Sequence, residues 1–178
     1  ADCVNCDAGK FVAQTGSDDA LDCIDCAAGK YVGATGSNEA SDCIDCVAGK
    51  YSSVVGMGSD NCVTCGPGKS VTTTGSDEES DCAACVIGQY STGTDVTCIN
   101  CVAGKYSMSE SPGNDDESKC IDCVAGKYFN QVAQSTDVCI TCGPGKSVVA
   151  TGSDAESDCI DCVAGRYSSG TDLSCIDC

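Results

Sequence analysis

Cysteine is the residue type in this chain whose side chain and regular spacing are suited to chemistry. All 20 Cys of the 178 residues fall into ten C-x-x-C pairs. Three kinds of chemistry use pairs of this spacing: zinc binding, thiol–disulfide exchange and structural cross-linking. The chain has no His, so it lacks the commonest metal ligand and acid–base residue. The pairs begin at Cys3, Cys23, Cys43, Cys62, Cys82, Cys98, Cys120, Cys139, Cys159 and Cys175.

Zinc binding fits the spacing but not the charge. The stretch from Cys3 to Cys26 reads C-x₂-C-x₁₆-C-x₂-C, a spacing typical of four-cysteine zinc sites. Four thiolates around Zn²⁺ add a net charge of about −2 per site. The chain already carries −18, and the residues inside the pairs are acidic or apolar. We therefore expect no metal site, and we expect no other cofactor.

Redox catalysis is disfavoured by the surroundings of the pairs. A reactive thiol needs a helix N-terminus or a neighbouring cation to lower its pKa. The sequence has no window of useful helical periodicity, and Asp often precedes the pair or lies inside it, as in CIDC. We expect no enzymatic activity. Structural disulfides are the favoured interpretation, and they indicate an extracellular protein, secreted or held at the cell surface.

The sequence alone leaves the disulfide connectivity open between two schemes. In one, the second Cys of each pair joins the first Cys of the next pair. In the other, two pairs join by parallel bridges, as Cys3–Cys23 with Cys6–Cys26. The first scheme treats every repeat alike, and its loops of roughly 14–20 residues would each contribute about 3 kcal/mol by chain entropy.

The pairs divide the chain into nine tandem repeats of about 20 residues, closed by a tenth pair at 175–178. We number the repeats 1 to 9; they start near 3, 23, 43, 62, 82, 98, 120, 139 and 159. We predict one continuous cysteine-rich array over 1–178, as a window of a longer array. Residues 43–101 and 120–178 are identical at 39 of 59 positions, which indicates a duplicated block.

Each repeat places a Gly three residues after its second Cys, and in seven repeats an aromatic residue follows two positions later. Gly at a fixed place indicates a turn that needs positive φ. The pattern predicts a short strand, a turn and another short strand. We expect each ring to lie against the disulfide of its own repeat. The fold class is a small, disulfide-rich, all-β and irregular structure, extended into an elongated tandem-repeat rod.

The string C-x-x-C-x-x-G-x-Y, as in residues 43–51 and 120–128, resembles the ephrin-receptor-like cysteine-rich repeats. It is also similar to the single-bridge modules of tumour necrosis factor receptors. The resemblance implies second-to-first bridging, with Cys3 and Cys178 pairing outside these residues. The implied pairs are Cys6–Cys23, Cys26–Cys43, Cys46–Cys62, Cys65–Cys82, Cys85–Cys98, Cys101–Cys120, Cys123–Cys139, Cys142–Cys159 and Cys162–Cys175.

The net charge of −18 disfavours binding to nucleic acid, and no apolar run is long enough for membrane insertion. Acidic runs such as 77–79 and 115–117 are candidate Ca²⁺ ligands, although no EF-hand loop is present. Ser/Thr clusters at predicted loop tips are candidate O-glycosylation sites. These residues are Thr72, Thr73, Thr74, Thr92, Thr94, Ser169 and Thr171.

The repetition favours a structural role. We predict an extracellular protein that builds a surface fibre, filament or tubular appendage by self-association, with other copies of itself as partners. The alternative is a receptor or adhesion ectodomain segment that binds a protein ligand. The Lys that follows the turn Gly, as in Lys10 and Lys30, is expected to meet acidic turns of a neighbouring copy.

Overall fold

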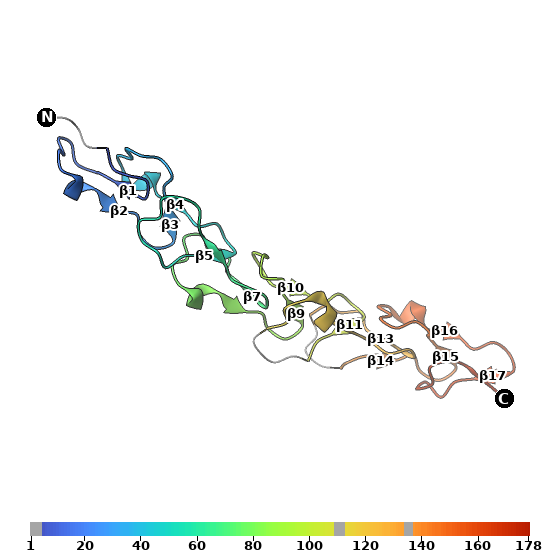
Figure 1. Ribbon diagram of the computed structural model, residues 1–178. Coiled ribbons are helices and arrows are strands. Elements are labelled where there is room, and N and C mark those ends of the chain that lie inside the picture. Colours follow the sequence, from blue (N-terminus) through green and yellow to red (C-terminus); the bar gives the residue numbers. More distant parts are fainter. Residues whose placement is uncertain (1–4, 109–112, 134–136) are drawn as a thin grey trace. The chain divides into compact units, whose positions relative to one another are not determined.

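The computed structural model describes residues 5–108, 113–133 and 137–178 of the chain (Figure 1). It divides into two compact units. The N-terminal unit comprises Ala1–Ala83 with Gly93–Thr97, and the C-terminal unit comprises Ala84–Thr92 with Cys98–Cys178. The single continuous array and the elongated rod remain predictions.

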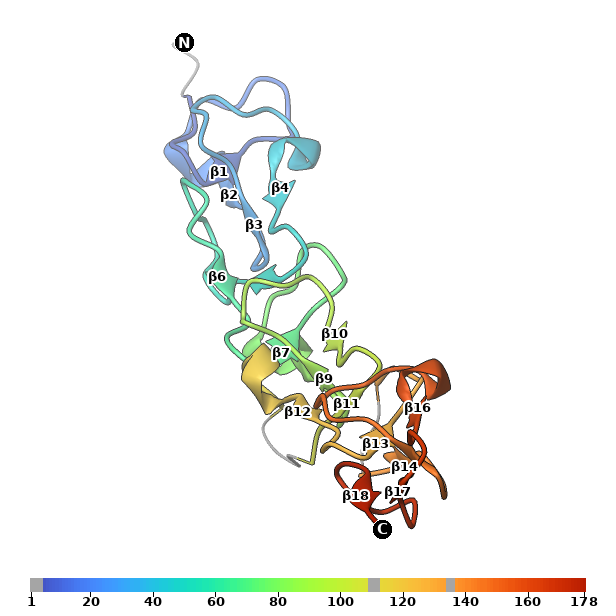
Figure 2. The same cartoon turned by 90° about the vertical axis from the view of Figure 1, so that its right-hand side faces the viewer.

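Two-residue strands dominate the secondary structure. One strand lies directly after the turn Gly of a repeat, and a second lies inside the cysteine pair that follows. These two strands pair as a hairpin (Figures 1 and 2). The hairpins of the described residues are β1 (Lys10–Phe11) with β2 (Ile24–Asp25), β3 (Lys30–Tyr31) with β4 (Ile44–Asp45), β5 (Lys50–Tyr51) with β6 (Val63–Thr64), β7 (Lys69–Ser70) with β8 (Ala83–Ala84), β9 (Gln89–Tyr90) with β10 (Ile99–Asn100), β11 (Lys105–Tyr106) with β12 (Ile121–Asp122), β13 (Lys127–Tyr128) with β14 (Ile140–Thr141), β15 (Lys146–Ser147) with β16 (Ile160–Asp161), and β17 (Arg166–Tyr167) with β18 (Ile176–Asp177).

A tight turn starts each hairpin. In repeat 7 the backbone N–H of Lys127 donates to the carbonyl of Val124 at 3.2 Å, and Gly126 has φ of 84°. Positive φ at the third residue of a four-residue turn is the conformation that Gly adopts most easily. The strand then pairs antiparallel with the next cysteine pair, so that Tyr128 lies opposite Ile140.

Short 3₁₀ helices precede several cysteine pairs, and no helical periodicity in the sequence predicted them. Carboxylates hold these segments by accepting backbone N–H groups. The Asp42 carboxylate accepts from Asn38 and Glu39, and Asp81 accepts in the same way from Asp77 and Glu78. The 3₁₀ helices of the described residues are η1 (Ala20–Asp22), η2 (Ala40–Asp42), η3 (Glu79–Asp81), η4 (Glu117–Lys119) and η5 (Glu156–Asp158).

Disulfides and the side chains packed on them form the core. One cluster joins Cys26, Cys43 and Val32 with the half-buried Phe11. Phe11 belongs to repeat 1, whereas this disulfide belongs to repeat 2. A second cluster likewise places the Tyr51 ring of repeat 3 on the bridge of repeat 4. The expectation that each ring packs on its own disulfide is therefore wrong at both places, because the hairpin carries the ring forward to the next repeat.

Backbone hydrogen bonds tie each repeat to the next one. The N–H of Gly9 donates to the carbonyl of Val32 at 2.8 Å, and Val12 donates to Ser37 at 3.1 Å. The second bond accompanies an isolated parallel bridge between Phe11 and Ser37. The segment after the turn Gly therefore pairs on both edges. Equivalent bridges join Tyr31 to Met57, Tyr51 to Ser76, Tyr90 to Asn114 and Tyr128 to Ser153.

Contacts also reach two repeats along the chain. A Cβ placed on Gly9 of repeat 1 would collide with the carbonyl oxygen of Gly56 in repeat 3. Gly29 in repeat 2 meets Gly75 in repeat 4 in the same way. The turn Gly therefore serves a second purpose, because only a residue without a side chain admits this backbone. The disulfide-rich, all-β repeat class is confirmed, and the described residues contain no α-helix.

Candidate interaction surface

The structure joins the cysteines in the pairs that the resemblance implies. The bridges are Cys6–Cys23, Cys26–Cys43, Cys46–Cys62, Cys65–Cys82, Cys85–Cys98, Cys101–Cys120, Cys123–Cys139, Cys142–Cys159 and Cys162–Cys175. Cys178 is an exposed thiol, and Cys3 lies outside the described residues. Among the described residues no three Cys, Asp or Glu side chains gather as a metal site would require.

Cations in most hairpins have acidic partners within the chain. Lys10 lies 2.9 Å from Asp25, which sits in the cysteine pair of the next repeat. The same arrangement joins Lys105 to Asp122 at 2.9 Å and the single Arg, Arg166, to Asp177 at 2.7 Å. These exposed pairs each contribute about 0–1 kcal/mol. Their cations already have carboxylate neighbours, which weakens the expectation that they seek a neighbouring copy.

Apolar side chains are exposed at one position of repeat after repeat. The position is the first residue inside the cysteine pair, which lies opposite the aromatic residue of the hairpin at Ile24 and Ile44 and opposite Ser147 at Ile160. Its exposed fraction is 52 % at Ile24, 52 % at Ile44 and 71 % at Ile160. Single exposed apolar residues are common on proteins, whereas one that recurs at a fixed place is available for a repeated contact. We call the set the apolar pair residues: Ile24, Ile44, Val63, Ile99, Ile121, Ile140, Ile160 and Ile176.

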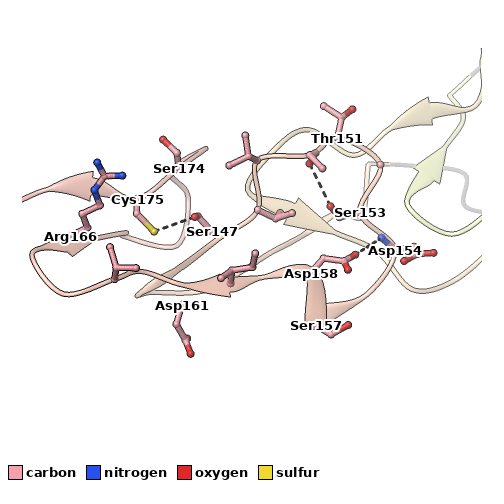
Figure 3. A pocket seen from close by; sticks show the side chains of 16 residues that line it. Ser147, Thr151, Ser153, Asp154, Ser157, Asp158, Asp161, Arg166, Ser174 and Cys175 are labelled. Atoms are coloured by element: carbon pink, nitrogen blue, oxygen red, sulfur yellow. Dashed lines mark hydrogen bonds between the residues drawn. The ribbon is translucent and has the colours of Figure 1, made fainter.

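Open pockets lie beside two of the apolar pair residues. The larger, of about 910 Å³, is in the C-terminal unit, where Val148, Thr151 and Ile160 are among its lining residues (Figure 3). The smaller, of about 360 Å³, lies in the N-terminal unit beside Ile44. Both include equivalent residues of a disulfide loop, 148–153 in repeat 8 and 32–37 in repeat 2, and the larger pocket also reaches Arg166 and Ser174 of repeat 9. Side chains of the larger pocket bond to neighbours, as the Ser147 hydroxyl does with Cys175 Sγ at 3.2 Å (Figure 3).

The candidate O-glycosylation residues are all exposed: Thr72, Thr73, Thr74, Thr92, Thr94, Ser169 and Thr171. Some of them also have hydrogen-bond partners within the chain. Thr73 lies 3.2 Å from the Ser76 hydroxyl, and the Ser169 hydroxyl donates to Asp172 at 2.8 Å. Their exposure is compatible with modification, and glycosylation itself remains a prediction.

Two Asp carboxylates at turns have perturbed pKa values. The backbone N–H of Ser118 donates to Asp116 at 2.6 Å and lowers the pKa of that carboxyl. The backbone N–H of Ser169 donates to Asp172 at 2.7 Å and lowers its pKa as well. Both carboxylates serve as local acceptors for turns. The acidic run 115–117 thus has a structural use, and Ca²⁺ binding remains a prediction.

These features together define an extracellular type of module, stapled by disulfides and repeated along the chain. Residues 33–82 match the family described as "Tyrosine-protein kinase ephrin type A/B receptor-like". This match confirms the ephrin-receptor-like resemblance over 50 of the 178 residues. No curated protein matches the chain. Within the described residues, no helix has the length and apolar character needed to cross a bilayer.

Proposed function

We propose that this chain is a non-enzymatic, structural extracellular protein that builds a fibre or filament by lateral self-association. The observation that carries the proposal is the recurrence of the exposed apolar pair residues from repeat to repeat. A contact made by one repeat can then be made again by the next, so weak contacts add along the array. Each buried apolar side chain contributes about 1.5–3 kcal/mol relative to an exposed one.

Charge opposes this assembly. The chain carries −18, and in most hairpins the cation is already paired with an acidic residue of the same chain. Copies therefore repel one another, whereas their apolar contacts persist when salt is added. The Debye length falls from about 10 Å at 0.1 M to about 3 Å at 1 M salt. Self-association should accordingly strengthen as ionic strength rises.

The test follows the mass of the oxidised chain by sedimentation and light scattering across a NaCl series. Replacing Ile24, Ile44 and Val63 together by Ser should raise the salt concentration needed for association. The matched control replaces Leu21, Val54 and Val55 by Ser, because these side chains are also apolar and are more exposed than the three test residues, but lie outside the cysteine pairs. A monomer at every salt concentration would overturn the proposal and favour the receptor-segment alternative.

The same series can include Ca²⁺ and material that carries native sugars. Ca²⁺ could bridge exposed carboxylates between copies, and O-linked glycans on the exposed Thr and Ser residues would separate them. If the assembly needs Ca²⁺ at constant ionic strength, cation bridging rather than apolar contact drives it.

A further inference from the structure

The disulfides of the described residues differ in how well the chain covers their second Cys. Each bridge begins at the second Cys of one pair and ends at the first Cys of the next pair, which we call the closing Cys. The closing Cys is buried in repeats 2, 4, 6 and 8, namely at Cys43, Cys82, Cys120 and Cys159. It is half-buried in repeats 1, 3, 5, 7 and 9, namely at Cys23, Cys62, Cys98, Cys139 and Cys175. The cover therefore alternates from repeat to repeat, which the C-x-x-C pattern alone does not show.

Two neighbouring pairs of repeats give matched comparisons: repeats 2 and 3 in the N-terminal unit, and repeats 6 and 7 in the C-terminal unit. All four repeats have two further repeats after them along the chain. The Cys at the start of the bridge is sealed in every case, with an exposed fraction of 0 % at Cys26 and Cys46 and of 1 % at Cys101 and Cys123. The comparison therefore isolates the closing Cys, which is buried in repeats 2 and 6 and half-buried in repeats 3 and 7.

A 3₁₀ helix leads into the buried closing Cys in both comparisons. The N–H of Cys43 donates to the carbonyl of Ala40 in η2 at 3.2 Å, and the N–H of Cys120 donates to the carbonyl of Glu117 in η4 at 2.9 Å. The described residues of repeats 3 and 7 contain no such helix. The segment that leads into the closing Cys thus differs between covered and half-covered bridges in the same way in both units.

An Asp carboxylate takes the place of the helix in repeats 3 and 7. Asp60 accepts the N–H of Cys62 at 3.2 Å, and Asp137 accepts the N–H of Cys139 at 3.2 Å. The hairpin Lys of each repeat lies close to this carboxylate, 3.9 Å from Asp60 and 3.8 Å from Asp137. Because the cation offsets the charge of the carboxylate, a thiolate that approaches the closing Cys meets less repulsion.

We propose that the Cys46–Cys62 and Cys123–Cys139 bridges are sites of thiol–disulfide exchange with small uncharged thiols. The bridges of repeats 2 and 6 are closed to the same reagents. Exchange requires access to the sulfur that is attacked, and exposed disulfides are the labile ones among structural bridges. An uncharged thiol is the fitting reagent, because the net charge of −18 repels anionic thiols. This site does not depend on the self-association proposed above.

The exchange takes place in two balanced steps. The thiolate of the first small thiol attacks Sγ of the closing Cys, and the bond to the Cys at the start of the bridge breaks. That Cys leaves as a thiolate and takes up a proton, so that one mixed disulfide and one thiol remain. A second small thiol then attacks the mixed disulfide and frees the closing Cys. Two molecules of the small thiol are thereby oxidised to one disulfide, and the chain gains two electrons and two protons.

Repeats 3 and 7 occupy the same place in the two duplicated blocks, which begin at residues 43 and 120. Each block therefore carries one such site, and both bridges join Cys residues 16 positions apart. Exchange releases the loop of one repeat, while the covered bridges of repeats 2 and 6 continue to close theirs.

The test exposes the oxidised chain briefly to 2-mercaptoethanol in native buffer and stops the reaction with acid. Peptide mass spectrometry then measures the mixed disulfide at each closing Cys. We expect the adduct to form at least about tenfold faster at Cys62 and Cys139 than at Cys43 and Cys120, because the exchange rate depends on access. Equal rates at the four positions would overturn the proposal.

The same measurement in concentrated urea separates cover by the fold from the local sequence. Unfolding exposes every bridge, so the rates at Cys62 and Cys43 should become equal. A rate ratio that stays the same in urea would show that neighbouring residues, and not the fold, set the reactivity, and it would overturn the proposal.

A loop exchange tests the segment that leads into the closing Cys. In the first chimaera residues 58–61 are replaced by the sequence of residues 38–42, and the rate at Cys62 should fall to that of Cys43. The matched control makes the reverse replacement in repeat 2 and should raise the rate at Cys43. Non-reducing peptide mapping confirms that both chimaeras keep the native bridges. A correctly bridged first chimaera that reacts at Cys62 as fast as the parent chain would overturn the role of this segment.

Discussion

Repeats 7 and 9 have nearly the same local sequence in two different surroundings. Residues 123–128 read CVAGKY, and residues 162–167 read CVAGRY. Both form the same hairpin with a bridge to the next pair. Gly126 is nevertheless buried under the Asp172 carbonyl of repeat 9, while Gly165 is exposed. The hairpin and the disulfide thus form with or without a covering repeat, whereas the burial of Gly126 comes from the Asp172 segment of repeat 9.

The largest expected effect comes from removing the disulfide of repeat 7 in one variant and the disulfide of repeat 9 in another. A loop of this length contributes about 3 kcal/mol by chain entropy. The double variant Cys123→Ser/Cys139→Ser should lose at least this much, and it should also loosen repeat 6, because Gly104 donates to the Phe129 carbonyl. Cys162→Ser/Cys175→Ser should loosen repeats 8 and 9, because Gly145 donates to the Ser168 carbonyl, and it should also loosen the turn of repeat 7, because the Asp172 carbonyl covers Gly126.

Hydrogen exchange by mass spectrometry can follow both variants. If exchange becomes faster only in repeat 7 of the first variant, repeats fold independently. That result would contradict the dependence of one repeat on its neighbours. Peptide mapping of the parent chain must first recover Cys123 linked to Cys139. A Cys120–Cys139 link would instead indicate parallel bridging.

A smaller effect is expected from the Gly residues themselves. Gly126→Ala and Gly165→Ala share the cost of positive φ, about 1–2 kcal/mol. Gly126→Ala also forces a Cβ to 2.9 Å from the Asp172 carbonyl oxygen, whereas Gly165→Ala meets nothing within 4 Å. We therefore expect Gly126→Ala to lose about 1–3 kcal/mol more. Urea unfolding of the oxidised monomer measures the difference, and equal losses would contradict the covering contact.

The smallest effect concerns pH. The Asp172 pKa is lowered chiefly by the backbone N–H of Ser169, with the Ser169 hydroxyl adding to it. Because the pKa of Asp172 is lower in the folded chain than its ordinary value of 3.8, its ionised carboxylate stabilises the turn at pH values above 3.8. This stabilisation is lost as the pH falls through the folded-state pKa. Exchange at Ser169 should therefore accelerate in acid, measured after correction for intrinsic rates. Asp172→Asn should remove that acceleration. If exchange at Ser169 still accelerates in acid in this variant, a titrating group other than Asp172 causes it.

Much of the fold could be predicted from local patterns. The C-x-x-C spacing, the Gly three residues later and the aromatic residue after it predict a disulfide-stapled array of short strands, because turns and loop closure depend on neighbouring residues. The 3₁₀ helices were missed. Their signal is an Asp directly before the cysteine pair, as at Asp42 and Asp81, whose carboxylate accepts N–H groups from a few residues upstream.

The sequence by itself determined the repeat, the turn at each Gly and, through the family resemblance, the cysteine pairing. Only the tertiary structure decided that Phe11 packs on the next disulfide, that Lys10 pairs with Asp25 and that Gly9 lies under Gly56. The physical reason is that these contacts depend on how hairpins stack.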